Sequence, residues 1–114
     1  MSGCLFCRIV AGEVPSTEVA SSDHTYAFRD IAPAMPTHVL VVPRQHIESA
    51  DTVRPEHADL LAEMFATAQD VARREQVEGH GYRLVFNVGE HAQNSVPHLH
   101  LHVLGGRPMQ WPPG

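Results

Sequence analysis

The segment 98–104 places the strongest constraint on how this chain folds, because histidines alternate with aliphatic residues along it. Successive side chains of a β-strand point to opposite faces of a sheet, so the pattern predicts a strand with imidazoles on one face. The residues on that face are His98, His100 and His102. Neighbouring rings would lie roughly 6–7 Å apart, two strand rises, and could therefore act together on one small ligand.

Imidazole changes its charge near neutral pH, so three such rings on one face favour chemistry over packing. One chemistry is covalent catalysis, in which a central imidazole attacks and a neighbour handles protons. Another is metal binding, because His-x-His on a strand can supply two zinc ligands. A third interpretation is a set of structural histidines at a barrel rim. The residues alone leave all three open.

Composition and charge exclude several classes of protein. A chain of 114 residues that is 43% hydrophobic predicts one domain, over 1–114, with its own core. Its net charge of −5 argues against binding to a nucleic-acid backbone. No apolar run approaches the ~18 residues that a membrane span needs, and Met1–Cys4 lacks the features of a secretory signal. We therefore expect a cytoplasmic protein that binds neither nucleic acid nor membrane.

Apolar periodicity predicts an α+β fold, in which one long helix covers a mainly antiparallel sheet of about five strands. The long helix is expected over Pro55–Val77, with Gly79 at its end, and a short helix over Leu5–Gly12. The expected strands are Val19–Ala20, Thr25–Arg29, His38–Val42, Tyr82–Val88 and Val96–Leu104.

The order His, apolar, His, apolar, His, apolar, apolar over 98–104 resembles the signature of the histidine triad (HIT) family. Other segments resemble the nucleotide-binding branch of that family: Ala27–Pro33, Pro36–His38, Val41–Ile47, Gly105–Arg107 and Trp111–Gly114. The resemblance implies a HIT-like fold, a homodimer, and hydrolysis of purine nucleoside phosphoramidates, with a purine nucleotide such as AMP or GMP as ligand. The alternatives are a nucleotide-binding regulatory or scaffold protein with little turnover, a dinucleoside polyphosphate hydrolase, and a metal-dependent hydrolase with the triad as ligands.

The same resemblance implies catalytic roles for four residues. His100 corresponds to the nucleophile, which would attack the α-phosphorus and form a nucleotidyl-imidazole intermediate. His102 would stabilise the phosphoryl oxygens and help with protons, and Ser95 would share a proton with the leaving group. His38 would contact the sugar or support the triad. This mechanism requires no metal.

The nucleotide contacts are also implied by the resemblance. Asp30 would accept both ribose hydroxyls, since an ionised carboxylate has two acceptor oxygens. Apolar residues that would enclose the base, although each alone is equally typical of a core, are Phe6, Ile9, Phe28 and Ile31. Polar residues expected near the phosphate and leaving group are Asn87, Gln93, Asn94, Ser95, His100 and His102. Trp111 would reach the nucleotide pocket of a neighbouring subunit. The two subunits would pair through the edge of the last strand or through the long helix.

The loop before the triad departs from the pattern of the branch. Gln93 replaces a glycine that lets the backbone approach phosphate closely. Pro97 lacks an N–H and has a fixed φ. We therefore expect a shifted loop with altered backbone contacts to phosphate.

A Cys-x-x-Cys pair, Cys4 and Cys7, precedes the first helix. Taken alone, it could be a redox pair, two core cysteines or half of a zinc site. Galactose-phosphate uridylyltransferases and many bacterial histidine triad proteins are similar in having such a pair, with two histidines, around zinc. That similarity implies a structural zinc on Cys4, Cys7, His46 and His98.

Overall fold

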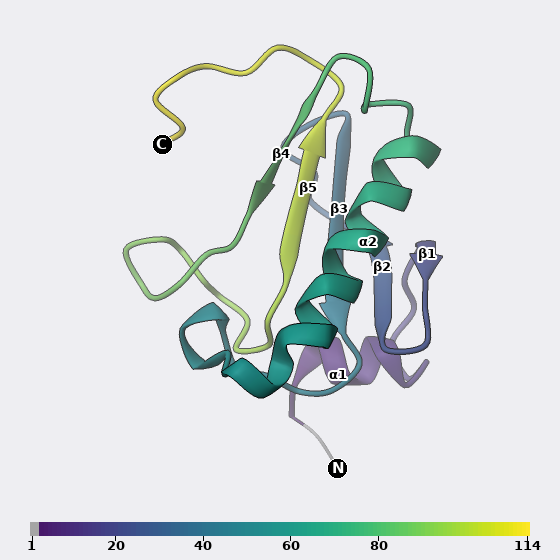
Figure 1. Cartoon of the computed structure of the whole chain (residues 1–114), viewed down its shortest axis with the longest axis vertical. Helices are drawn as coiled ribbons and strands as arrows, with labels where there is room; N and C mark the ends of the chain where they lie inside the picture. Colours follow the sequence, from purple (N-terminus) through teal and green to yellow (C-terminus); the bar gives the residue numbers. More distant parts are fainter. Residues whose placement is uncertain (1–2) are drawn as a thin grey trace.

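The computed structural model describes residues 3–114 and contains a five-stranded antiparallel sheet in the order β1-β2-β3-β5-β4 (Figure 1). The strands are β1 Glu18–Ser21, β2 Thr25–Arg29, β3 Thr37–Pro43, β4 Tyr82–Val85 and β5 Leu101–Gly105. The helices are α1 Leu5–Val10 and α2 Ala58–Arg74, with short 3-10 turns at Ala50–Thr52 and Pro55–His57. The predicted α+β architecture is therefore confirmed. The first two residues of the expected domain lie outside the described range.

Strand β3 is buried along its whole length because a helix covers each face of the sheet at this strand. Val39 and Val41 belong to the core under α2, whereas Leu40 and Val42 pack with residues of α1. Figure 1 shows α2 in front of the sheet and α1, drawn fainter, behind its lower end. Because side chains alternate along a strand, His38 shares the α1 face with Leu40.

Helix α2 packs through buried residues that recur at three- and four-residue steps: Met64, Thr67, Ala68, Val71 and Ala72. The predicted helix was too long at both ends. Pro55 opens a separate 3-10 turn, and the α-helix begins only at Ala58. At the other end, Gln76 takes a left-handed conformation with a φ of 60°, which ends the helix before Gly79.

The last strand begins later than predicted, at Leu101. Pro97 cannot donate to a ladder, and the N–H of Leu99 donates to Ile47 in the loop after β3, at 2.6 Å. Strand β5 lies between β3 and β4, so the prediction that it offers an edge to a second copy is wrong. The edge strands of the described sheet are β1 and β4.

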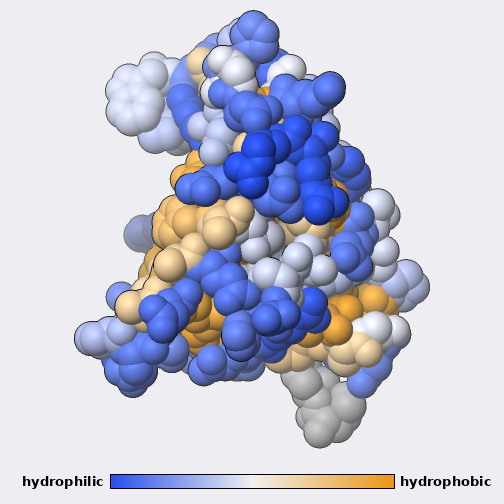
Figure 2. Space-filling view, turned by 45° about the vertical axis from the view of Figure 1, so that its right-hand side comes forward, coloured by the Kyte–Doolittle hydropathy of each residue, from blue (hydrophilic) through white to orange (hydrophobic). Residues whose placement is uncertain are grey.

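The remaining boundary differences are small. Strand β1 extends one residue beyond the prediction at each end, and β4 stops at Val85 instead of Val88. Helix α1 ends at Val10, and Gly12 then adopts a left-handed φ of 79°. Figure 2 shows one face of the molecule, where apolar side chains form separate patches between polar areas. Within residues 3–114, no helix has the length and hydropathy needed to cross a membrane.

Candidate functional site

A pocket of about 320 Å³ lies between α1, the sheet and the loop that precedes the triad. It brings together all the residues predicted to contact nucleotide except Asn94 and Trp111. The predicted residues that line it are Phe6, Ile9, Phe28, Asp30, Ile31, Asn87, Gln93, Ser95, His100 and His102. Residues that are far apart in the sequence, from position 6 to position 102, thus converge on one cavity, as a small-molecule site requires.

Three further residues line this pocket, and the sequence-based prediction did not include them: Leu5, Leu40 and Val96. Leu40 is the central one, because it lies opposite Phe28 on one side and opposite His102 on the other. A signal for Leu40 was available in the sequence, since it is two positions from His38 and therefore on the same strand face.

Aromatic side chains form the inner wall of the pocket. The ring of Phe6 meets Phe28 edge-on at a centroid distance of 5.5 Å and His100 at 5.1 Å. Ile31, by contrast, lies at the mouth with 98% of its surface exposed. The pocket therefore combines a buried aromatic wall with exposed apolar side chains, of which Ile31 is the most exposed.

A chain of hydrogen bonds determines which nitrogen of His102 carries the proton. The N–H of Ala34 donates to Nδ1 of His38 at 3.0 Å, so the neutral His38 ring carries its proton on Nε2. That Nε2 lies 2.9 Å from Nδ1 of His102 and donates to it. His102 must then be protonated on Nε2, which is buried and has no hydrogen-bond partner within residues 3–114. The pocket wall thus contains an unused N–H donor.

Burial keeps both of these rings neutral. It is the main cause that lowers the pKa of His102 to about 4, with the neighbouring His100 and His38 lowering it further. Burial also lowers the pKa of His38, although Asp30 opposes the shift through a carboxylate oxygen 3.4 Å from Nε2. Near pH 7 both rings are therefore uncharged, as the hydrogen-bond chain requires.

His100 has the opposite tautomer. Its Nδ1 lies 2.7 Å from the main-chain oxygen of His98, and because a carbonyl only accepts, Nδ1 carries the proton. Nε2 of His100 is then the unprotonated nitrogen. The rings of His100 and His102 are 5.0 Å apart, so the pocket combines a nucleophilic nitrogen with a hydrogen-bond donor.

The loop before the triad bends sharply at Gln93. This residue has a φ of 60°, a left-handed conformation that glycine adopts at little cost and glutamine at a higher one. The side chains of Gln93 and Ser95 line the pocket. Asn94 does not line it, and its Oδ1 is buried without a partner within the described residues.

The second constellation consists of the predicted metal ligands. One ligand atom each from Cys4, Cys7, His46 and His98 lies within 4.8 Å of all the others. Cys4 is the N-cap of α1, where its Sγ accepts from the N–H of Cys7 at 3.4 Å. This contact holds Sγ of Cys4 against the main chain of Cys7 at the start of the helix.

Distances within the cluster fit a tetrahedral zinc site. Zinc–nitrogen bonds of about 2.0 Å and zinc–sulfur bonds of about 2.3 Å imply separations of about 3.3 Å between two nitrogens and about 3.5 Å between nitrogen and sulfur. The Nδ1 atoms of His46 and His98 are 3.2 Å apart, and Nδ1 of His98 lies 3.3 Å and 3.4 Å from the two sulfurs. Nε2 of His98 donates to Pro43 at 2.9 Å, which leaves Nδ1 as the lone-pair nitrogen that a metal needs.

Trp111 is not part of the pocket in this chain. Its side chain is 81% exposed, and the guanidinium carbon of Arg83 lies 5.8 Å from its ring centroid. The guanidinium of Arg83 also donates to the main-chain oxygen of Gln110. Arg83 therefore supports the C-terminal tail from β4, with its guanidinium over one face of an indole that is otherwise exposed.

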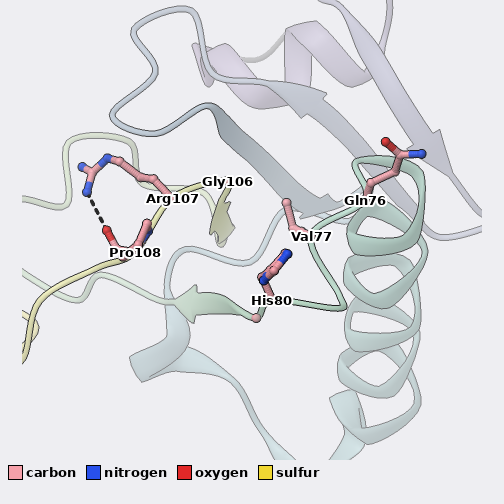
Figure 3. Close-up of a pocket in the computed structure, with 7 residues that line it drawn as sticks. Gln76, Val77, His80, Gly106, Arg107 and Pro108 are labelled. Atoms are coloured by element: carbon pink, nitrogen blue, oxygen red, sulfur yellow. Dashed lines mark hydrogen bonds between the residues drawn. The ribbon is translucent and has the colours of Figure 1, made fainter.

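A separate hollow of about 550 Å³ lies near the end of α2 and includes none of the triad residues (Figure 3). Val77 and His80 lie on one side of it, whereas the guanidinium of Arg107 is turned away and donates to Pro108 at 3.1 Å. It therefore offers no convergent charged groups to a ligand.

Known proteins match this chain over nearly its full length. The family model described as "Scavenger mRNA decapping enzyme C-term binding" matches residues 3–111. The purine nucleoside phosphoramidase of Escherichia coli (strain K12) is 40% identical over 105 residues, which cover 92% of this chain and 88% of that protein. A 14 kDa zinc-binding protein of Zea mays is 41% identical over 115 residues, covering 99% and 89%.

The fold agrees with these sequence matches. The crystal structure of a HIT family hydrolase from Legionella pneumophila Philadelphia 1 superposes with a TM-score of 0.95 and 46% identity, covering 98% of this chain and all of that one. Such agreement in sequence and structure shows that this chain belongs to the histidine triad family, as a hydrolase homologous to purine nucleoside phosphoramidase.

Proposed function

We propose that the protein hydrolyses purine nucleoside phosphoramidates through a covalent nucleotidyl intermediate on His100. The observation that carries the proposal is the pair of opposite tautomers in one pocket. In the neutral tautomer that the His98 carbonyl selects, Nε2 of His100 carries the lone pair, and Nε2 of the neighbouring His102 is a buried donor with no partner in the described chain. A nucleophile beside a fixed donor suits attack on a phosphorus atom whose oxygens gain negative charge.

The pocket offers a matching position for each part of a purine nucleotide. The aromatic wall of Phe6 and Phe28, with Ile9 and Ile31, would enclose the base. Asp30 would bind the ribose hydroxyls, since its Oδ1 accepts only one described bond, from Ala32 at 2.8 Å. Polar pocket residues that would surround the phosphate and leaving group are Asn87, Gln93, Ser95 and His102.

The reaction proceeds by two displacements at the α-phosphorus. Nε2 of His100 forms a bond to phosphorus as the P–N bond to the amine breaks, and the leaving amine takes up a proton from the hydroxyl of Ser95, which regains one from water. Water then attacks the same phosphorus and gives up a proton to solvent, the bond to His100 breaks, and the nucleoside monophosphate leaves. His102 donates its Nε2 proton in a hydrogen bond to a phosphoryl oxygen throughout, which stabilises the charge that develops there.

Turnover of adenosine 5′-phosphoramidate by the purified protein tests the proposal. We expect His100→Ala to lose activity by a factor of about 10³ or more and to form no adenylate adduct by mass spectrometry. His80→Ala is the matched control, because His80 lies in the separate hollow of Figure 3. Full activity of His100→Ala contradicts the mechanism, and an inactive wild-type protein favours a regulatory role instead.

A chelator separates this mechanism from metal-dependent hydrolysis. Oxygen and nitrogen atoms of Asp30, His38 and His102 also lie within 4.8 Å of one another and could hold an ion. Nδ1 of both histidines is already used in the hydrogen-bond chain, which supports the metal-free mechanism. Activity that survives chelation at low temperature agrees with it.

We also propose that the cluster of Cys4, Cys7, His46 and His98 holds one structural zinc per chain. Two thiolates and two imidazoles complete a tetrahedral shell with no open position, so the ion would contribute folding energy and not catalysis. It would attach α1, which supplies Phe6 to the pocket, to the segment that bears the nucleophile.

A homodimer is the third part of the proposal. Strand β4 is a sheet edge, and Leu84 on it is 36% exposed, while Phe65 on α2 is 39% exposed. Antiparallel pairing of two β4 edges around a two-fold axis would satisfy their backbone groups and cover these side chains. Trp111 would then approach the partner's pocket. A mass near twice 12.6 kDa by light scattering is expected, and a monomer at micromolar concentration contradicts it.

A further inference from the structure

We propose that Glu75 is a positioning residue for ribose recognition, acting through the two strand ends that carry Asp30 and His38. The inference rests on the proposed function, because it requires Asp30 to bind the ribose hydroxyls. Glu75 itself lies outside the pocket, so it would act on the nucleotide only through its neighbours.

The carboxylate of Glu75 joins three elements. It follows the last residue of α2, and its own N–H donates to Val71 at 2.9 Å, so the helix fixes its position. Arg29 donates to Oε1 at 2.8 Å and to Oε2 at 2.7 Å, a two-pronged bond with defined geometry. The hydroxyl of Thr37 donates to Oε1 at 3.4 Å.

The two residues held in this way directly precede site residues. Arg29 is the last residue of β2, and Asp30 follows it; Thr37 is the first residue of β3, and His38 follows it. The N–H of Asp30 donates to the main-chain oxygen of His38 at 3.0 Å, which ties the two positions together. Movement of the Glu75 carboxylate would therefore displace Asp30 and His38 jointly.

Burial makes this contact more than a surface ion pair. The side chain of Glu75 is only 13% exposed, although that of Arg29 is 44% exposed. The hydrogen bond from Arg29 is the largest cause that lowers the pKa of Glu75, so the carboxylate is charged at neutral pH. Figure 3 shows the neighbouring Gln76 at the end of α2, with its amide directed away from Val77 and His80.

Ribose selectivity distinguishes positioning from simple stabilisation. The measured quantity is the ratio of kcat/KM for adenosine 5′-phosphoramidate to that for its 2′,3′-dideoxy analogue. A carboxylate hydrogen-bonded to the ribose should make the wild-type ratio about tenfold or larger. We expect Glu75→Ala to lower this ratio at least about threefold, mainly through KM of the ribose substrate, with a smaller decrease for Glu75→Gln.

Two further variants complete the experiment. The activity of every variant is measured at a temperature where circular dichroism shows folded protein. Exchange of the partners, Arg29→Glu with Glu75→Arg, restores the bridge and should recover most of the ratio. Asp70→Asn is the matched control, because Asp70 pairs with Arg73 and Arg74 on the same helix and connects to the sheet only through the bond from Arg74 to Val19 of β1, which does not line the pocket. It should leave the ratio unchanged.

Each contrary outcome identifies what has failed. A wild-type protein that hydrolyses both substrates equally well removes the ribose role of Asp30, and with it both this inference and that part of the proposed function. A wild-type protein that discriminates, with Glu75→Ala retaining the full ratio, overturns the inference alone. An equal loss of activity on both substrates also overturns the inference alone, since it indicates a purely structural ion pair.

Discussion

Two neighbouring groups of histidines use the same side chain in different ways. In the pocket, protein groups determine the tautomers of His38, His100 and His102, and one hydrogen bond follows another. In the cluster, Nδ1 of His98 and Nδ1 of His46 face each other at 3.2 Å beside two sulfurs. The first group is held by hydrogen bonds within the protein, with Nε2 of His102 left without a partner among residues 3–114, whereas the second brings together atoms that a cation would hold.

His98 belongs to both groups through different atoms. Its ring points Nδ1 toward the cysteines, and its main-chain oxygen accepts from Nδ1 of His100. The two histidines are only two residues apart, yet the ring of His98 faces the cysteines and the ring of His100 lines the pocket. If the cluster holds the proposed structural zinc and the pocket carries out the proposed reaction, substitutions in the two groups should have separable effects on stability and on rate.

The largest expected effect is on stability, from Cys4→Ser. Serine also caps helices well, so the variant keeps the N-cap of α1 and removes only a metal ligand. Loss of a closed zinc site should lower the free energy of unfolding by several kcal/mol and the Tm by about 10 °C or more. Turnover at low temperature should stay within about threefold of wild type.

Metal analysis and thermal unfolding check this prediction together. Wild-type protein should contain about one zinc per chain, and Cys4→Ser should contain almost none. Chelation should lower the Tm of wild-type protein but not that of the variant. A variant as stable as zinc-loaded wild type, or one with full stability and lost activity, contradicts the division of roles.

The next effect is on the rate, from the donor at Nε2 of His102. His102→Ala removes that donor and should lower kcat about 10²-fold, as for other donors to a developing oxyanion. His102→Gln can place an amide N–H near the same position and should recover part of the loss. Equal rates for these two variants would show that the Nε2 proton is not used, and thermal unfolding serves as the control for folding.

Much of the fold follows from local patterns in the sequence. The apolar run of β3 and the three- and four-residue steps of α2 predicted a buried central strand and a covering helix, and both are present. The boundaries differ where backbone conformation decides them, as at Gln76, where a left-handed residue ends α2 before the expected glycine. Pro97 likewise delays the last strand.

The candidate site was predictable as a set of residues but not as a set of bonds. The triad motif and its flanking segments predicted most of the residues that line the pocket. The hydrogen bond between His38 and His102 joins residues 64 positions apart, and the Arg29–Glu75 bridge joins residues 46 apart. No local pattern encodes such pairs, because they depend on how β2, β3, β5 and α2 meet in space.

The smallest expected effect is on the pH dependence of stability. The pKa of His102 falls from 6.5 to about 4 on folding, chiefly by burial. Between these values the unfolded chain binds a proton that the folded chain does not, so stability is full above pH 6.5 and decreases as the pH falls toward 4.

Metal release would add its own acid sensitivity, so the experiment uses a Cys4→Ser, Cys7→Ser background. Adding His102→Gln there should flatten the slope of unfolding free energy against pH by up to about one proton. Identical slopes would mean that His102 is not held neutral by the pocket, and the hydrogen-bond chain through His38 would then need a different tautomer.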